Sequence, residues 1–190
     1  IDLLMNQVEE ILDTYLKDLD YNVAVDSPSI ADGPTEACSK VIELLEQNID
    51  LLVGCTDKSV VEVYQKEIVE RLFQVIVKTL KKRTISVTGA MSLINDLNTY
   101  YEFVLEHIKT NRRAITPLFQ ALKKVGNIYL ISGSDSKSIG KLVSDLSKFN
   151  GIFTQEEIYE FVHKRADWLL IKLDVEKVMY GLSLGDCSIV

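Results

Sequence analysis

The last four residues, Cys187-Ser188-Ile189-Val190, form the motif with the most specific chemistry in this sequence. A cysteine fourth from the end, followed by an aliphatic residue and then a small last residue, is the C-a-a-X pattern for prenylation. Prenylation requires an accessible thiol, and residues 182–190 are expected to form a flexible tail. Ser188 and Val190 are unusual at their positions, so the type of prenyl group stays open. The sequence predicts a lipid on Cys187, unless the pattern arises by chance where the sequence stops.

Two clusters of basic residues are the next candidates for a binding site: Lys81, Lys82 and Arg83, and Lys109, Arg112 and Arg113. Both clusters fall near expected helix C-termini, where cations stabilise the helix dipole. The alternative is contact with anionic lipid headgroups of a membrane or with an acidic partner. The chain has 21 basic and 28 acidic residues, a net charge of −7. This balance argues against a nucleic-acid partner, because phosphate binding requires a clearly basic surface.

The sequence lacks recognisable catalytic and metal-binding motifs. Its cysteines are Cys38, Cys55 and Cys187, without a CxxC pair, and its histidines are His107 and His163. We therefore expect no enzyme, no metal and no cofactor, and we expect Cys38 and Cys55 to be reduced and unlinked in a cytosolic protein. A helical enzyme or small-ligand carrier remains the alternative from another class, which a converging polar pocket would favour.

A row of polar residues, Asn95-Asp96-Leu97-Asn98, lies in the middle of an expected helix. Asp96 shares a helix face with Tyr100, four residues further on. The row could contact a partner protein or form hydrogen bonds to a neighbouring helix. We favour hydrogen bonds between helices, because a buried polar group needs a partner.

Apolar residues recur at helical spacing along nearly the whole chain, and this periodicity predicts eight helices. The expected ranges are 2–19, 34–53, 57–83, 89–110, 116–130, 139–146, 154–162 and 167–181. Residues 84–88 are β-branched but too few to make a sheet. The sequence predicts at least ~60% helix and no sheet of three strands.

Residues that favour helix ends mark several of these boundaries. Thr116 is expected as an N-cap with Pro117 at the first helical position, and Asp167 as the cap of the last helix. Thr154 and Glu157 have the spacing of a capping box. Short connections between amphipathic helices favour antiparallel neighbours. The sequence thus predicts an all-α fold, an elongated antiparallel helical bundle of one domain over residues 1–190, with 182–190 as its tail.

Three segments resemble a known family. Residues 89–101, GAMSLINDLNTYY, are similar to a helix start in the exocyst component 5 family of vesicle-tethering proteins. IYEFV at 158–162, followed by RADW at 165–168, also resembles that family. VEKVMYGL at 175–182, followed by DC at 186–187, is similar to its recyclin branch, fungal F-box proteins that end in a C-a-a-X box.

The resemblance implies a non-enzymatic helical-rod tether, as the C-terminal part of a longer protein with an F-box near its N-terminus. It also implies binding of a GTP-bound Rab GTPase and of other trafficking proteins, and a role in recycling from endosomes to the Golgi and plasma membrane. The location would be cytoplasmic and peripheral to membranes of endosomes, the Golgi and sites of polarised growth, with Cys187 as lipid anchor. The alternative is an exocyst component 5 subunit that tethers vesicles before exocytosis.

Overall fold

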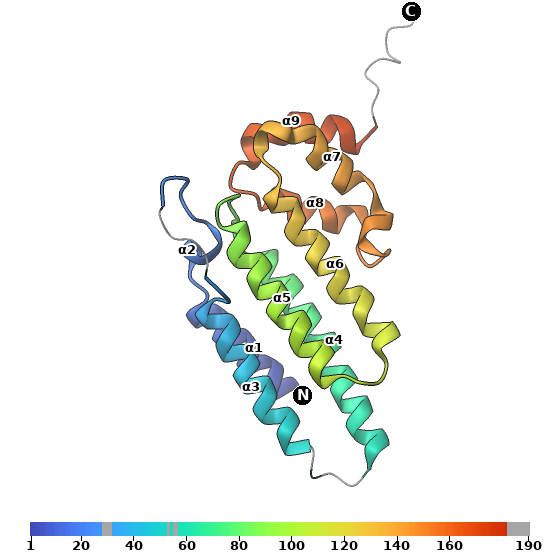
Figure 1. Cartoon of the computed structure of the whole chain (residues 1–190). Helices are drawn as coiled ribbons and strands as arrows, with labels where there is room; N and C mark the ends of the chain where they lie inside the picture. Colours follow the sequence, from blue (N-terminus) through green and yellow to red (C-terminus); the bar gives the residue numbers. More distant parts are fainter. Residues whose placement is uncertain (28–31, 53, 55–56, 182–190) are drawn as a thin grey trace, which may run out of the picture.

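The computed structural model describes residues 1–27, 32–52, 54 and 57–181 (Figure 1). The α-helices of this part are α1 (Asp2–Tyr15), α2 (Asp18–Tyr21), α3 (Glu36–Leu52), α4 (Lys58–Leu80), α5 (Ala90–His107), α6 (Arg112–Leu130), α7 (Ser136–Ser144), α8 (Gln155–His163) and α9 (Trp168–Met179). Two short 3-10 helices, η1 (Gly133–Asp135) and η2 (Leu146–Phe149), flank α7. Helices make up 76% of the described residues, which confirms the all-α prediction.

The long helices form an elongated bundle, and consecutive members from α3 to α6 run in opposite directions (Figure 1). The first helix, α1, runs parallel to α4, since Asp2 pairs with Arg71 and Glu9 pairs with Lys78, seven residues further along each helix. The short helices α7, α8 and α9 lie together at one end of the bundle (Figure 1). The predicted antiparallel helical bundle is therefore confirmed.

Aromatic side chains join these terminal helices to the long ones. Phe73 of α4 stacks on Phe153 with ring centroids 5.9 Å apart, and Phe119 of α6 meets Phe73 edge-on at 6.3 Å. Phe153 in turn contacts Phe161 of α8 edge-on at 5.1 Å. Such edge and offset contacts stabilise aromatic pairs beyond the burial of their area. The end helices are thus packed into the same core as the bundle.

Asp96 and Asn95 of the polar row in α5 bond to neighbouring segments, as the hydrogen-bonding hypothesis predicted, whereas the buried Oδ1 of Asn98 has no hydrogen-bond partner among the described residues. The buried Asp96 carboxylate accepts hydrogen bonds from the Tyr21 hydroxyl at 2.5 Å and from the Thr35 amide and hydroxyl, both at 2.7 Å. Burial raises the pKa of Asp96, and these hydrogen bonds oppose the rise. Asp96 therefore fixes the chain on both sides of residues 28–31 to the middle of α5.

The first helix ends earlier than the periodicity indicated. We expected it to continue to residue 19, but α1 ends at Tyr15, and Leu16 is extended before the single turn of α2. The turn brings Tyr21 to Asp96 and places the Tyr21 carbonyl against Gly89. A Cβ atom at position 89 would lie 1.9 Å from that carbonyl oxygen, so only glycine fits there. Tertiary contacts override the local helical pattern here.

Two other helices begin where the cap residues did not indicate. The helix expected from residue 116 begins at Arg112, so Thr116 is not its N-cap and Pro117 lies inside it. Asn111 adopts a left-handed φ of 58°, which makes the turn from α5 to α6 tight enough for this early start. The helix expected from residue 34 begins at Glu36, because the Thr35 hydroxyl accepts a hydrogen bond from the Cys38 amide.

Of the remaining predictions of helix ends, one is confirmed and one is corrected. The capping box of Thr154 and Glu157 is present, with reciprocal bonds of 3.0 and 3.2 Å. Asp167 lies at the N-cap position of α9 but makes no capping bond, because Arg165 binds its carboxylate. Ile85, in the short β-branched stretch, forms an isolated parallel bridge with Arg165, and the described ranges contain no strand.

Candidate protein-binding surface

The outer side of α9 carries an apolar surface that no other helix of the described structure covers. Leu169 and Leu170 are each 87% exposed and Leu173 is 72% exposed, and the half-exposed Tyr180 follows on the same side. At 100° per residue these four positions fall within about a quarter to a third of the helix circumference. We call Leu169, Leu170 and Leu173 the leucine face. An exposed apolar patch of this kind marks an interaction site more often than isolated surface leucines do.

The opposite side of α9 packs into the core and holds the leucine face in place. Trp168, Ile171, Val175 and Met179 are buried, and α9 packs chiefly against α7. Gly140 of α7 allows this close approach, since a Cβ atom there would lie 2.5 Å from the Cβ of Val178. The helix is therefore apolar on both sides, whereas a surface helix ordinarily has one polar side.

A buried arginine fixes the turn that leads into α9. The Arg165 guanidinium donates to the carbonyls of Ile128 and Ile131 at 2.6 and 2.7 Å, at the C-terminal end of α6. It also donates two bonds of 2.9 Å to the Asp167 carboxylate. Planar guanidinium geometry suits this combination of a bidentate pair and two carbonyls. Arg165 thus positions the first residue of α9 relative to the long helices.

Two polar contacts further along α9 keep its charged residues beside the leucine face. The Tyr159 hydroxyl donates to Glu176 at 2.8 Å, and this bond raises the pKa of Tyr159 to about 12. Ser136 donates to Asp174 at 3.2 Å. Lys172 and Lys177 are exposed nearby. The leucine face therefore has a rim of both charge signs, the usual surrounding of a protein interface.

The first basic cluster, predicted as a contact for membrane or acidic partners, forms ion pairs within the chain. Lys81 lies 3.5 Å from Glu157 and 3.6 Å from Glu160, and Arg83 lies 3.2 Å from Asp18. Lys82 is exposed at the end of α4. These contacts are ion pairs with carboxylates of other segments, and they leave Lys82 as the most accessible charge of the three.

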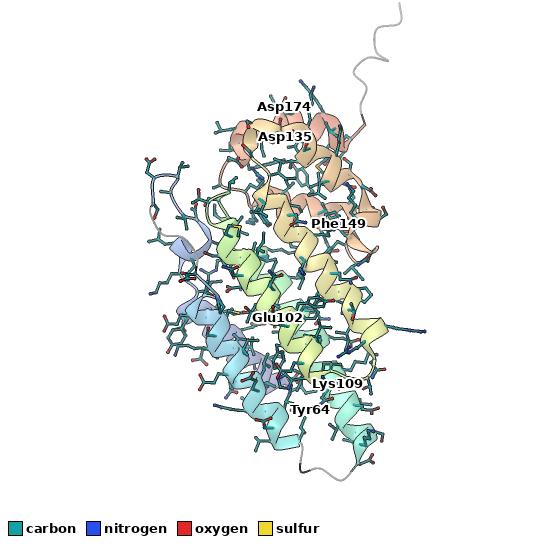
Figure 2. The ribbon with its side chains drawn as sticks, in the orientation of Figure 1. Tyr64, Glu102, Lys109, Asp135, Phe149 and Asp174 are labelled. Atoms are coloured by element: carbon teal, nitrogen blue, oxygen red, sulfur yellow. The ribbon has the colours of Figure 1, made fainter. Side chains whose placement is uncertain are left out.

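The second basic cluster lies at the other end of α5. Arg112 donates to the carbonyls of Ile108 and Leu105 at 3.0 and 2.8 Å, so it caps α5, while Lys109 and Arg113 are exposed. Figure 2 shows Lys109 at the end of the bundle opposite α9. The 18 residues of α5 span about 27 Å between the clusters. The structure therefore does not bring the two clusters together into one site.

The cysteines and histidines do not converge in the described part of the chain. Cys38 is buried and free, and burial raises the pKa of its thiol; Cys55 and the predicted prenylation site Cys187 lie outside the described residues. His107 packs on Phe103, whereas His163 packs on Trp168. Within the ranges that the structure describes, no group of three metal-ligating side chains occurs, and no helix is long and apolar enough to cross a bilayer.

Sequence reasoning missed the leucine face, although a signal for it was present. The apolar stripe expected for the last helix included Trp168, Ile171 and Val175, and these residues are buried. Leu169, Leu170 and Leu173 fall outside that stripe and were assigned no role. A helix with leucines beyond its core stripe contains more apolar residues than one buried side requires, and this excess could have been counted from the sequence.

Comparison with known proteins places these features in a family context. Residues 1–177 match the family described as exocyst complex component Sec10-like, α-helical bundle. Recyclin-1 of Saccharomyces cerevisiae is 50% identical over 100% of this chain, and F-box protein pof6 of Schizosaccharomyces pombe is 37% identical over 79% of it. Exocyst complex component 5 of Oryza sativa is 22% identical over 91% of it. The chain spans 23%, 17% and 20% of these proteins, respectively.

Proposed function

Because the chain belongs to the family of exocyst complex component Sec10-like α-helical bundles, we propose that it is a non-enzymatic module of vesicle trafficking that binds a GTP-bound Rab GTPase. The residues of its second half predicted this family. The exposed leucine face of α9 is the observation that carries the proposal. In this role the protein acts in the cytoplasm, at endosomes, the Golgi and sites of polarised growth. Identity of 50% to Recyclin-1 supports recycling from endosomes as its pathway.

The size of the leucine face suits the centre of a regulated interface. Burial of one leucine side chain contributes about 1.5–3 kcal/mol, so three leucines supply roughly 4–9 kcal/mol before the costs of association. That is enough to anchor a contact of micromolar affinity, about −8 kcal/mol, with the charged rim adding specificity. The nucleotide preference follows if the partner's switch segments cover the leucines, because only the GTP form orders those segments.

Membrane attachment in this proposal combines two weak signals. A prenyl group on Cys187 would give only marginal, reversible binding on its own. A bound Rab, which brings its own lipid anchors, supplies the second signal. The alternative second signal is the exposed charge of Lys82 at one end of α5, or that of Lys109 and Arg113 at the other end, worth about 1 kcal/mol per charge near an anionic surface.

The test compares binding of matched variants to a panel of Rab GTPases loaded with GTP analogue or GDP, by calorimetry. Leu169→Asp combined with Leu173→Asp should weaken binding to the GTP form at least ~10-fold, because charge would be buried in the interface. The matched control is Leu19→Asp with Leu51→Asp, since both leucines are 78% exposed and lie away from α9. Equal affinity for the GTP and GDP forms, or equal losses in both double variants, would reject the proposal.

Assembly with exocyst subunits is the second candidate function. Matches to Exocyst complex component 5 of Oryza sativa and to the Sec10-like family support it. In this case the leucine face would bind another subunit, and the affinity would be independent of guanine nucleotide. The same pair of double variants, tested against purified exocyst subunits, separates this function from the Rab interaction.

A further inference from the structure

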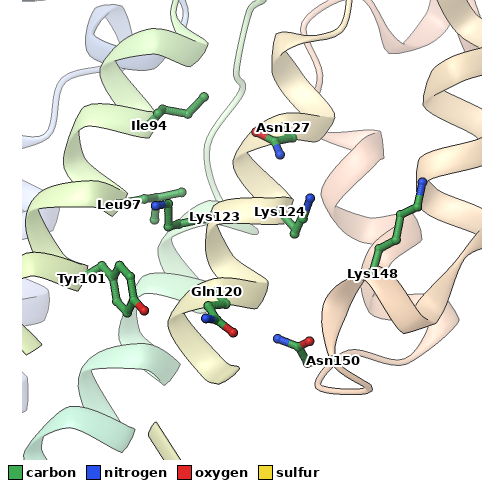
Figure 3. Close-up of a pocket in the computed structure, with 9 residues that line it drawn as sticks. All are labelled: Ile94, Leu97, Tyr101, Gln120, Lys123, Lys124, Asn127, Lys148 and Asn150. Atoms are coloured by element: carbon green, nitrogen blue, oxygen red, sulfur yellow. The ribbon is translucent and has the colours of Figure 1, made fainter. Parts of the chain in front are cut away.

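A second surface lies on the side of the bundle where α5, α6 and η2 meet. It is a groove of about 400 Å³ that we call the lysine groove (Figure 3). Its lining residues are Ile94, Leu97, Tyr101, Gln120, Lys123, Lys124, Asn127, Lys148 and Asn150. None of these residues belongs to α9, so the groove and the leucine face are separate surfaces.

The floor of the groove is apolar and comes from α5. Ile94, Leu97 and Tyr101 lie on one side of that helix, three or four residues apart; Leu97 is buried in the core, so Ile94 and Tyr101 supply the accessible surface. Gly126 of α6 leaves the space that Ile94 and Leu97 occupy, since a Cβ atom there would lie 3.1 Å from Ile94 and 3.2 Å from Leu97. The Tyr101 ring also stacks with Phe119 at 6.4 Å. The floor is therefore held firmly by the core.

The rim of the groove is positively charged. Lys123, Lys124 and Lys148 are exposed, and none of them forms an ion pair with a carboxylate of the residues that the structure covers. Asp145, the acidic residue closest in sequence to Lys148, accepts two hydrogen bonds from Ser147, which lower its pKa, and forms no ion pair with Lys148, although the charge of Lys148 also helps to lower the pKa of Asp145. No acidic side chain lines the groove. In a chain of net charge −7, this concentration of unpaired positive charge stands out.

Side-chain amides complete the rim. Gln120 and Asn127 come from α6 and Asn150 from the turn after η2, and Figure 3 shows Lys148 and Asn150 across from the α5 residues. Each amide has donors and an acceptor, and that of Asn150 already donates one hydrogen bond to the Pro117 carbonyl at 3.2 Å. An extended peptide has backbone N–H and C=O groups that need such partners when it binds to a surface.

We propose that the lysine groove binds an extended acidic segment of a partner protein, with one apolar side chain of that segment resting on the half-buried Ile94 and Tyr101. The carboxylates of the segment pair with Lys123, Lys124 and Lys148, and its backbone bonds the amides. Charge complementarity identifies the occupant as anionic, and the apolar floor identifies it as a peptide. An anionic membrane surface would meet the lysines but would leave the recessed floor unused. The ammonium of Lys123 lies 5.3 Å from the Tyr101 ring centroid, so this rim lysine contacts one side of the floor through the ring.

Fluorescence anisotropy with defined peptides tests this proposal. The probe is a fluorescein-labelled peptide of Asp and Glu residues around a central Leu-Phe pair, and a second peptide replaces that pair by Ala-Ala. Lys123→Glu with Lys148→Glu should weaken binding of the first peptide at least ~10-fold, and added salt should weaken it further. Lys137→Glu with Lys141→Glu, two exposed lysines of α7 outside the groove, is the charge-matched control and should leave binding unchanged.

Three results would overturn the proposal. The first is no measurable binding of the Leu-Phe peptide, and the second is equal binding of the Ala-Ala peptide. The third is that phosphatidylserine-containing vesicles of phosphatidylcholine bind the chain and lose that binding in the groove variant, while the peptide does not bind. In the supporting case, NMR resonances of the side-chain amides of Gln120, Asn127 and Asn150 shift on addition of the peptide. These measurements contain no Rab GTPase, so the peptide proposal and the Rab proposal can each fail without the other.

Discussion

Replacement of Arg165 by methionine should destabilise the fold strongly, because this guanidinium connects the end of α6 to Asp167 at the start of α9. Its side chain is 1% exposed and donates four hydrogen bonds, two to carbonyl groups at the end of α6 and two to Asp167. Methionine keeps the aliphatic volume, so the loss is mainly that of the charged donors.

The expected loss of stability is the sum of the costs for the groups that lose the guanidinium as a hydrogen-bond partner. Two carbonyls, of Ile128 and Ile131, lose their partner, at about 1–2 kcal/mol each. Asp167 loses a bidentate partner but is 27% exposed and regains water, so its share is about 1 kcal/mol. The expected loss is therefore about 3–5 kcal/mol, in the range found when one partner of a buried pair is removed. For a chain of this size, such a loss lowers Tm by roughly 10 °C.

Thermal and urea unfolding, followed by far-ultraviolet circular dichroism and by tryptophan fluorescence, measure this effect. Trp168 is the one tryptophan of the sequence and begins α9, so its fluorescence reports the release of that helix. Arg113→Met, at an exposed arginine, is the control and should change stability by less than about 0.5 kcal/mol. A loss below about 1 kcal/mol for Arg165→Met would refute the argument that these four bonds fix α9.

Two further predictions concern α5 and α7. Because burial holds the pKa of Asp96 above its ordinary value of 3.8, the folded state binds this proton more tightly than the unfolded chain does. The contribution of Asp96 to stability is thus greatest below pH 3.8 and declines as pH rises through the raised pKa; Asp96→Asn should remove that slope in urea titrations at a series of pH values. Gly140→Ala should destabilise by about 1–3 kcal/mol, measured by thermal unfolding, because the new Cβ would lie 2.5 Å from the Cβ of Val178. A stabilised Gly140→Ala variant would show instead that helix propensity outweighs this contact.

Local sequence signals predicted those parts of the fold that depend on local interactions. The capping box at Thr154 marks the start of α8 because its side chain bonds the Glu157 amide, three residues away. The early start of α6 was not predictable in the same way, because Arg112 bonds carbonyls of the preceding helix and Asn111 supplies the left-handed turn. Likewise, the end of α1 depends on contacts of Tyr21 with residues far away in sequence.

Of the two candidate surfaces, one could likewise be predicted from local sequence and the other could not. The leucine face was within reach of the sequence, since Leu169, Leu170 and Leu173 all belong to one helix. The lysine groove was not, because Tyr101, Lys123 and Lys148 come from three elements, and periodicity does not reveal which helices adjoin. Of the basic residues singled out from the sequence, Arg83 and Arg112 bind groups within the chain. Clustering in sequence therefore did not distinguish accessible charges from internal partners.

During synthesis, the hydrogen bond between Tyr21 and Asp96 can form only after both residues have emerged. The two residues are 75 positions apart, so at about 5–20 residues per second Tyr21 precedes its acceptor by roughly 4–15 seconds. Over this interval α1 can pack against α3, which follows it closely, but the segment between them has no anchor on α5. The helices α1 and α3 therefore emerge before α5, the helix that holds the segment between them. The helix α4, which pairs with α1, emerges earlier, but the segment between α1 and α3 can bond to α5 only after residue 96 has emerged.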